Sequence, residues 1–84
     1  MLNDDILIFF ARSKLRLEVL KKLNQKPQIA SFLAHNMEKH REVISRIFLD
    51  LQKKGLSVCK NPNSPHFRYY KITPKGKKVL EELI

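Results

Sequence analysis

The sequence predicts a mainly helical α+β domain, in which three helices are followed by a β-hairpin and a short final helix. Between residues 13 and 54 apolar side chains recur at helical spacing, and between residues 56 and 72 they alternate on either side of a turn-rich stretch. The 84 residues, of which 43% are hydrophobic and 30% charged, are enough for one compact domain and too few for two.

The first two helices are predicted to be short. A helix over residues 13–23 has apolar residues three and four positions apart, and Ser13 can serve as its N-cap. Pro27 separates it from a second helix over residues 30–36, which Phe32 and Leu33 are expected to anchor.

The third helix, predicted over residues 40–54, is longer and has two distinct faces. At 100° per residue, one face carries Ile44, Ile47, Phe48 and Leu51. The opposite face carries Glu42, Arg46, Leu49 and Lys53. Gly55 stands where a helix C-cap is expected, so the helix ends there.

The chain then changes to the period of a β-strand. Leu56 and Val58 alternate with polar neighbours, and so do Tyr70 and Ile72. Residues 60–66 contain two prolines and two asparagines, which indicates a hairpin with a long loop. Thr73 followed by Pro74 is a typical helix start, and it begins the final helix.

Residues 1–12 form an apolar N-terminal arm that offers more hydrophobic surface than one small domain needs. Its longest apolar run, residues 6–11, implies burial on several sides. We expect part of the arm to cover the core of the domain that spans residues 13–84. The rest, together with the C-terminal helix, is predicted to form a twofold homodimer contact.

The charge balance favours a polyanionic partner. Lys and Arg number 17 against 8 Asp and Glu, which gives a formal net charge of +9. Charge alone does not separate nucleic acid from an anionic membrane, but no apolar run reaches the ~20 residues that span a bilayer. Cys59 is the single cysteine, so no intramolecular disulfide forms, and a cytoplasmic protein without a membrane partner is predicted.

Two short helices, a longer third helix and a β-hairpin are the order of a winged helix-turn-helix. A helix about 10–12 Å across fits the B-DNA major groove, which is about 12 Å wide. The hairpin, or wing, then lies along the neighbouring backbone or minor groove. This arrangement predicts binding to double-stranded DNA.

Residues 33–46, 51–56 and 68–76 carry three motifs in order along the chain, and Asn61-Pro62 stands beside Cys59. These features resemble winged-helix regulators of the MarR/ArsR-like type, small archaeal members in particular. Leu33-Ala34, followed after nine residues by Ile44-Ser45-Arg46, is similar to their LA-x(9)-V-S-R pattern. Residues 51–56 are similar to the L-x-x-x-G-L entrance to the wing, and residues 68–76 to its R-x-Y-x-hydrophobic-T-x-x-G exit. Glu38 and Lys39 depart from the pattern, because the turn before the third helix usually carries Gly and an apolar residue.

The resemblance implies a sequence-specific transcription regulator, which with the predicted homodimer contact would bind DNA as a dimer. The third helix would contact base edges or phosphates through Arg41, Ser45 and Arg46, with Glu42 accepting from a cytosine amino group or pointing aside. Phosphate contacts are expected near the helix starts, at Ser31, Lys39 and His40. Wing contacts are expected from Lys60, Asn61, Asn63, His66 and Arg68.

Other functions remain open at this stage. The chain could be a non-specific architectural DNA binder, or a winged helix used for protein–protein contact. Cys59 and the three histidines lack the spacing of a metal site, so no metal or other cofactor is predicted. No nucleophile–base pair or phosphate-cradling glycine loop is present, so we do not expect an enzyme.

Overall fold

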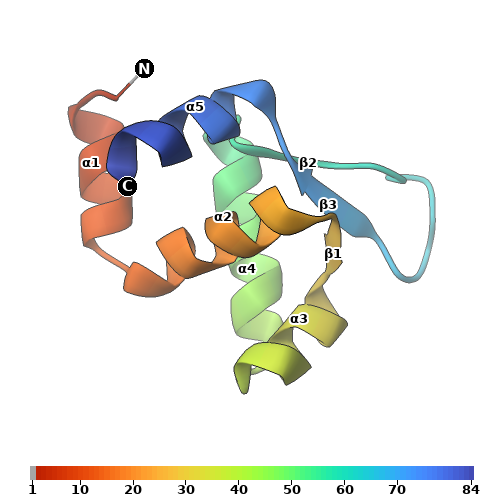
Figure 1. Cartoon of the computed structure of the whole chain (residues 1–84). Coiled ribbons are helices and arrows are strands. Elements are labelled where there is room, and N and C mark those ends of the chain that lie inside the picture. Colours follow the sequence, from red (N-terminus) through yellow and green to blue (C-terminus); the bar gives the residue numbers. More distant parts are fainter. Residues whose placement is uncertain (1) are drawn as a thin grey trace.

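The computed structural model describes residues 2–84 as five helices with a small sheet at one side of the molecule (Figure 1). Residue 1, the first of the predicted arm, lies outside the described residues. The helices are α1 (Asp4–Ala11), α2 (Lys14–Gln25), α3 (Ala30–Met37), α4 (Arg41–Lys53) and α5 (Pro74–Leu83). The strands are β1 (Gln28–Ile29), β2 (Ser57–Cys59) and β3 (Tyr69–Ile72).

The three central helices, the hairpin and the final helix occur in the predicted order. The N-cap predictions at Ser13 and Thr73 are confirmed, because their side chains accept hydrogen bonds from the backbone N–H groups of Arg16 and Gly76. The predicted faces of α4 are confirmed as well. Its apolar face is buried, and the side chains predicted for the opposite face are exposed.

The sheet has three antiparallel strands in the order β1-β3-β2. β2 and β3 form the hairpin, with Ser57 opposite Ile72 and Cys59 opposite Tyr70. The sequence did not predict β1, whose two residues pair with Tyr69 and Tyr70 of β3. Helix-turn-helix elements followed by such a sheet are compatible with a winged helix.

The alternation predicted before the loop differs in detail from the structure. Ser57 is buried and donates a hydrogen bond from Oγ to the carbonyl of Phe48 (3.1 Å), whereas Val58 is exposed. Leu56 is buried just before β2 begins. A small polar residue takes the inward position because α4 offers it an acceptor.

The N-terminal arm contains a helix. Ile6, Phe9 and Phe10 face the core of the domain, while Leu7 and Ile8 on the other side of α1 are 46% and 50% exposed. Part of the arm therefore covers the domain's own core. The dimer contact of the rest stays a prediction.

Arg16 of α2 joins three helices. Its Nη1 donates to the carbonyl of Phe9 (2.6 Å), and its guanidinium lies 4.1 Å from the centre of the Phe9 ring. Its Nη2 lies 3.6 Å from Oδ2 of Asp50 in α4. These contacts fix α1 and α4 against α2 and engage an acidic side chain of α4.

The turns on either side of α4 use the same hydrogen-bond pattern with different residues. Gly55, at φ 77°, follows α4 in the left-handed conformation, which agrees with the helix end predicted at this residue. Glu38, at φ 56° and ψ 46°, takes the equivalent position after α3. Lys39 N–H donates to the Ala34 carbonyl (2.9 Å) and Glu38 N–H to the His35 carbonyl (3.2 Å). The turn thus forms without glycine, at a steric cost.

Within residues 2–84, no helix is both long enough and apolar enough to cross a membrane.

Candidate nucleic-acid interface

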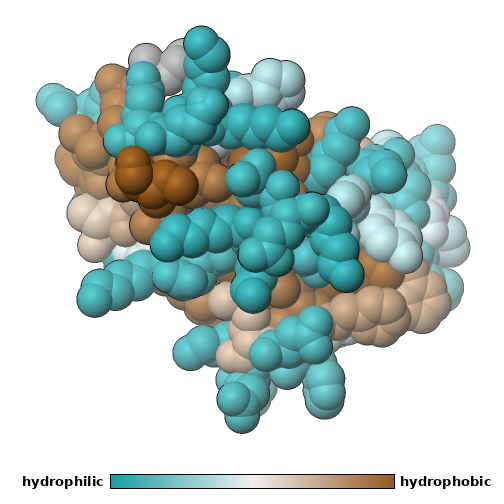
Figure 2. Space-filling model, in the orientation of Figure 1, coloured by the Kyte–Doolittle hydropathy of each residue, from teal (hydrophilic) through white to brown (hydrophobic). Residues whose placement is uncertain are grey.

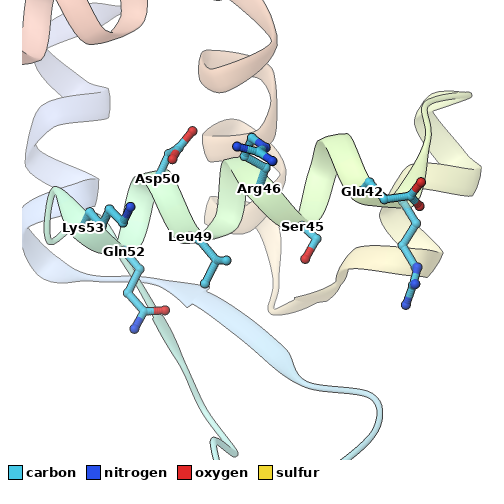
Figure 3. Close-up of a pocket in the computed structure, with 8 residues that line it drawn as sticks. Glu42, Ser45, Arg46, Leu49, Asp50, Gln52 and Lys53 are labelled. Atoms are coloured by element: carbon cyan, nitrogen blue, oxygen red, sulfur yellow. The ribbon is translucent and has the colours of Figure 1, made fainter.

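The outward face of α4 projects polar and charged side chains along its length (Figure 3). Arg41, Glu42, Ser45 and Arg46 occupy its N-terminal half, and all four are exposed. Ile44, Ile47 and the other inward residues hold the helix against the core, so this face stays clear of the domain's own interior. The three residues predicted to read bases therefore lie together on one accessible surface.

The two arginines on this face form no ion pair within the described part of the chain. Asp50, one turn beyond Arg46, is engaged by Arg16. Glu42 lies in the first turn of α4, where the positive end of the helix dipole stabilises a carboxylate. The cationic groups of Arg41 and Arg46 are thus available to an anion.

A groove runs between the start of α3, the face of α4 and the tip of the wing. Five of the predicted DNA contacts line it: Ser31, Arg41, Ser45, His66 and Arg68. They come from three separate elements of the chain, so only the fold brings them together. Arg68 is held at the tip, because its Nε donates to the Ser64 carbonyl (3.0 Å).

Tyr70 forms part of the inner end of this groove. Its ring packs against Phe48 with centroids 4.9 Å apart, as expected of a residue that belongs more to the core than to the surface. Burial raises the pKa of the Tyr70 phenol above its ordinary value, and the nearby Cys59 raises it further while Arg68 lowers it. The phenol is therefore neutral at physiological pH.

The remaining predicted residues lie outside the groove. Lys39 and His40 are exposed in the connection between α3 and α4. Lys60 and Asn63 are exposed in the part of the wing loop that follows β2. Glu42 and Arg46 stand beside the groove on the adjoining surface of α4.

Asn61, which is predicted to contact DNA, forms hydrogen bonds within the wing loop. Its Oδ1 accepts from the Tyr69 N–H (2.8 Å), and its Nδ2 donates to the Phe67 carbonyl (3.2 Å). Its side-chain amide therefore closes the wing loop on itself. Its part in DNA contact stays a prediction.

Sequence reasoning missed several residues of the groove. Leu49 lies on its edge and is 48% exposed, although its place on the polar face of α4 was recognisable from the helical spacing. Phe67 also lines the groove and is 62% exposed. The sequence feature that could have identified Phe67 is its position as an aromatic residue beside Arg68 in a loop rich in turn residues.

Charge is unevenly distributed over the molecule. Residues 51–80, which include the whole wing, contain no Asp or Glu. Their cations are Lys53, Lys54, Lys60, Arg68, Lys71, Lys75, Lys77 and Lys78. Half of the eight acidic residues lie instead at the start of α1 and the end of α5, namely Asp4, Asp5, Glu81 and Glu82. The α1 corner is thus acidic, while the wing is cationic.

The order of α3, a turn and α4, the small antiparallel sheet and the exposed cationic face of α4 are together compatible with a protein of the helix-turn-helix kind. A curated protein from Methanocaldococcus jannaschii, described as an uncharacterised HTH-type transcriptional regulator, is 36% identical to this chain over 69 residues. The match covers 79% of this chain and 64% of that protein, so the chain spans less than two thirds of its relative's length.

The relative's description agrees with the arrangement of α3 and α4. No family model matches the sequence. The general prediction of a helix-turn-helix protein is supported by this similarity. The narrower assignment to the MarR/ArsR-like type stays a prediction.

Proposed function

We propose that this protein is a transcription regulator that binds double-stranded DNA in a sequence-specific manner, with α4 in the major groove and the wing on the adjoining backbone or minor groove. The observation that carries the proposal is the exposed outward surface of α4, which Arg41, Ser45 and Arg46 line together. The relative from M. jannaschii, described as an HTH-type transcriptional regulator, supports it.

The shape of α4 suits a major groove. The helix has 13 residues and is therefore about 20 Å long. Its inward face is buried in the core, while Arg41, Glu42, Ser45 and Arg46 on the outward face are exposed. An arginine on such a face can donate two hydrogen bonds to guanine O6 and N7, which discriminates against other bases by about 1–3 kcal/mol.

The groove between α3 and the wing suits a phosphate backbone. Arg41 and Arg68 supply charge from opposite sides, and Ser31 supplies a hydroxyl at the start of α3. No side chain caps the first turn of α3, which leaves its N–H groups without a side-chain acceptor. Backbone N–H groups at a helix start commonly bind phosphate oxygens.

We further propose that the regulator is a homodimer joined through α1. Leu7 and Ile8 form an exposed apolar strip in the middle of this helix, between the acidic Asp4 and Asp5 at one end and Arg12 at the other. If two copies of α1 pack antiparallel, Asp4 and Asp5 of each lie opposite Arg12 of the second copy. Figure 2 shows hydrophobic surface gathered at this end of the molecule, and Figure 1 shows the C-terminus, where Ile84 is exposed, near α1.

Selection of bound sequences from a random duplex pool tests sequence-specific binding. A palindromic motif, bound more tightly than random duplex at fixed salt, is the expected result. Equal affinity for selected and random duplexes would instead indicate an architectural DNA binder. No affinity for duplex at moderate salt would favour a protein–protein role.

Two variants then separate base reading from backbone binding. Arg46→Ala should weaken binding to the selected site by about 1–3 kcal/mol and relax base preference. Lys60→Ala should weaken binding to all duplexes alike and reduce the salt slope by about one unit. Identical behaviour of the two variants contradicts the roles proposed for α4 and the wing.

A further inference from the structure

Two phenylalanines form an exposed aromatic pair where the wing meets α3. The rings of Phe32 in α3 and Phe67 in the wing loop lie 6.2 Å apart between centroids, at an angle of 38°. They remain 59% and 62% exposed. Figure 2 shows a patch of hydrophobic surface between α3 and the wing. Exposed apolar side chains that gather in this way mark contact surfaces more often than isolated ones do.

The backbone of Phe67 holds its ring in this exposed position. Its φ of 53° lies in the left-handed region, which is uncommon for a bulky residue. The Asn61 side chain stabilises this conformation by donating to the Phe67 carbonyl and accepting from the Tyr69 N–H. Backbone strain that the surroundings enforce is concentrated at functional positions. The wing loop therefore displays Phe67 at a local energetic cost.

The surroundings of Phe67 favour nucleic acid over protein. The ring lines the groove that also contains Arg41, His66 and Arg68. The acid-free stretch of residues 51–80 surrounds it in sequence. An apolar tip among cations matches the minor groove of a duplex, whose sugar walls are apolar and whose rims are phosphates.

We infer that Phe67 enters the minor groove beside the major groove occupied by α4, and that it makes the protein prefer A·T pairs there. This inference rests on the proposed DNA-binding function. Phe32 supports the ring from the protein side, so that Phe67 need not fold against its own loop. The groove lined by Arg41 and Arg68 then holds the backbone strand that separates the two grooves of the duplex.

The expected preference follows from the hydrogen-bond chemistry of the groove floor. A G·C pair places the N2 amino group of guanine in the minor groove, whereas an A·T pair presents only acceptors there. A phenyl ring that covers this amino group offers it no acceptor and removes it from water. An unsatisfied donor of this kind reduces affinity by about fivefold to tenfold.

Base substitution in the DNA tests this contact directly. The selected duplex is prepared with A·T, G·C or inosine·C pairs at the positions that flank the α4 footprint. Inosine·C has the major-groove face of G·C but lacks the minor-groove amino group. Wild-type protein should bind the A·T and inosine·C duplexes alike, and the G·C duplex about fivefold or more weakly.

Protein variants assign the preference to Phe67. Phe67→Ala should bind all three flanks with nearly the same affinity, while its salt slope stays that of wild type because no phosphate contact is lost. Tyr69→Ala is the matched control. Tyr69 is an exposed aromatic residue of the adjacent strand, 43% exposed, and it lines a different depression from Phe67. This variant should keep the full flank preference.

The outcomes distinguish this inference from the function on which it rests. If wild type binds its selected site but ignores the flanks, the Phe67 inference is wrong and the regulator proposal stands. If, in addition, Phe67→Ala changes the molecular mass measured by light scattering, the aromatic pair contacts protein instead. If wild type binds no duplex at all, the proposed function fails first.

Discussion

Replacing Gly76 with alanine should destabilise the protein, although alanine is the better helix former. A Cβ atom at Gly76 would lie 2.3 Å from the Leu56 carbonyl oxygen and 2.7 Å from Cγ1 of Ile72, well inside the 3.4 Å at which ordinary contact begins. The Leu56 oxygen cannot move easily, because it accepts the N–H of Thr73 at 3.0 Å. Helix α5 must therefore shift away from the base of the wing.

The size of the effect follows from these contacts. Overpacking of this kind costs about 1–3 kcal/mol. A shift of α5 also disturbs its N-cap, where Thr73 Oγ1 accepts from the Gly76 N–H (3.0 Å) and donates to the Gly55 carbonyl (2.6 Å), a contribution of about 1 kcal/mol. The higher helix propensity of alanine returns about 1 kcal/mol. The net loss of about 2 kcal/mol lowers the thermal midpoint by about 10–15 °C.

Thermal unfolding followed by circular dichroism measures this loss. Lys77→Ala, at an exposed position of the same helix, is the control and should stay within about 0.5 kcal/mol of wild type. A Gly76→Ala midpoint equal to or above that of wild type would mean that helix propensity dominates. The close approach of α5 to the Leu56 carbonyl would then be refuted.

Three further predictions concern the turn, the wing and the dimer. Glu38→Gly should raise stability by about 0.5–1 kcal/mol in chemical denaturation, because glycine relieves the left-handed conformation, and a loss of stability contradicts this. Asn61→Ala should remove the hydrogen-exchange protection of the Tyr69 amide, whereas Asn61→Asp, which keeps the accepting oxygen, should retain most of it. Equal protection in both variants would show that the Asn61 side chain does not hold the Tyr69 amide. Ile8→Lys should give a monomeric mass in light scattering, while Val58→Lys, at an exposed apolar residue of β2, should leave the dimer intact; a dimer in both variants places the contact elsewhere.

The helices of this protein were predictable wherever burial follows a single face. In α4 the residues Ile44, Ile47, Phe48 and Leu51 have the spacing of one helical face, and the structure buries all four, whereas Val43 and Leu49 lie off that face and are exposed. The buried face of the N-terminal arm was harder to predict, because a continuous apolar run conceals the helical period. Ile6, Phe9 and Phe10 nevertheless have the i, i+3, i+4 spacing of one helical face, and these are the residues of α1 that the core buries.

Short strands and loop conformations were not predictable in the same way. β1 has two residues, too few to establish any period, and it exists because β3 offers it a free edge. Ser57 faces inward because the Phe48 carbonyl accepts its hydroxyl, which is a tertiary contact. The position of Phe67 depends on the Asn61 side chain six residues earlier. These features arise from partners that local sequence does not reveal.

The residues of the candidate site also differ in how far the sequence could predict them. The α4 residues were recognisable because a helix face is a local property of the sequence. The groove was not, because Ser31 and Arg68 stand 37 positions apart in the chain and meet only through β1–β3 pairing and the turn of the wing. Sequence alone therefore named many of its residues without predicting which of them share a surface.

The proposed dimer also determines how far apart the two DNA half-sites should lie. Helix α1 and the wing lie on opposite sides of the protomer (Figure 1), so a twofold axis at α1 leaves both wings and both α4 faces uncovered. The longest extent of the protomer is 34 Å, so the centres of two copies joined at α1 lie about that far apart. One turn of B-DNA separates half-sites by about 34–36 Å. We therefore expect the selected palindrome to have half-sites one turn apart, and affinity to fall when five base pairs are inserted between them, because the second half-site then faces the other side of the duplex. Tolerance of that insertion, or half-sites two turns apart, would contradict a dimer built on α1.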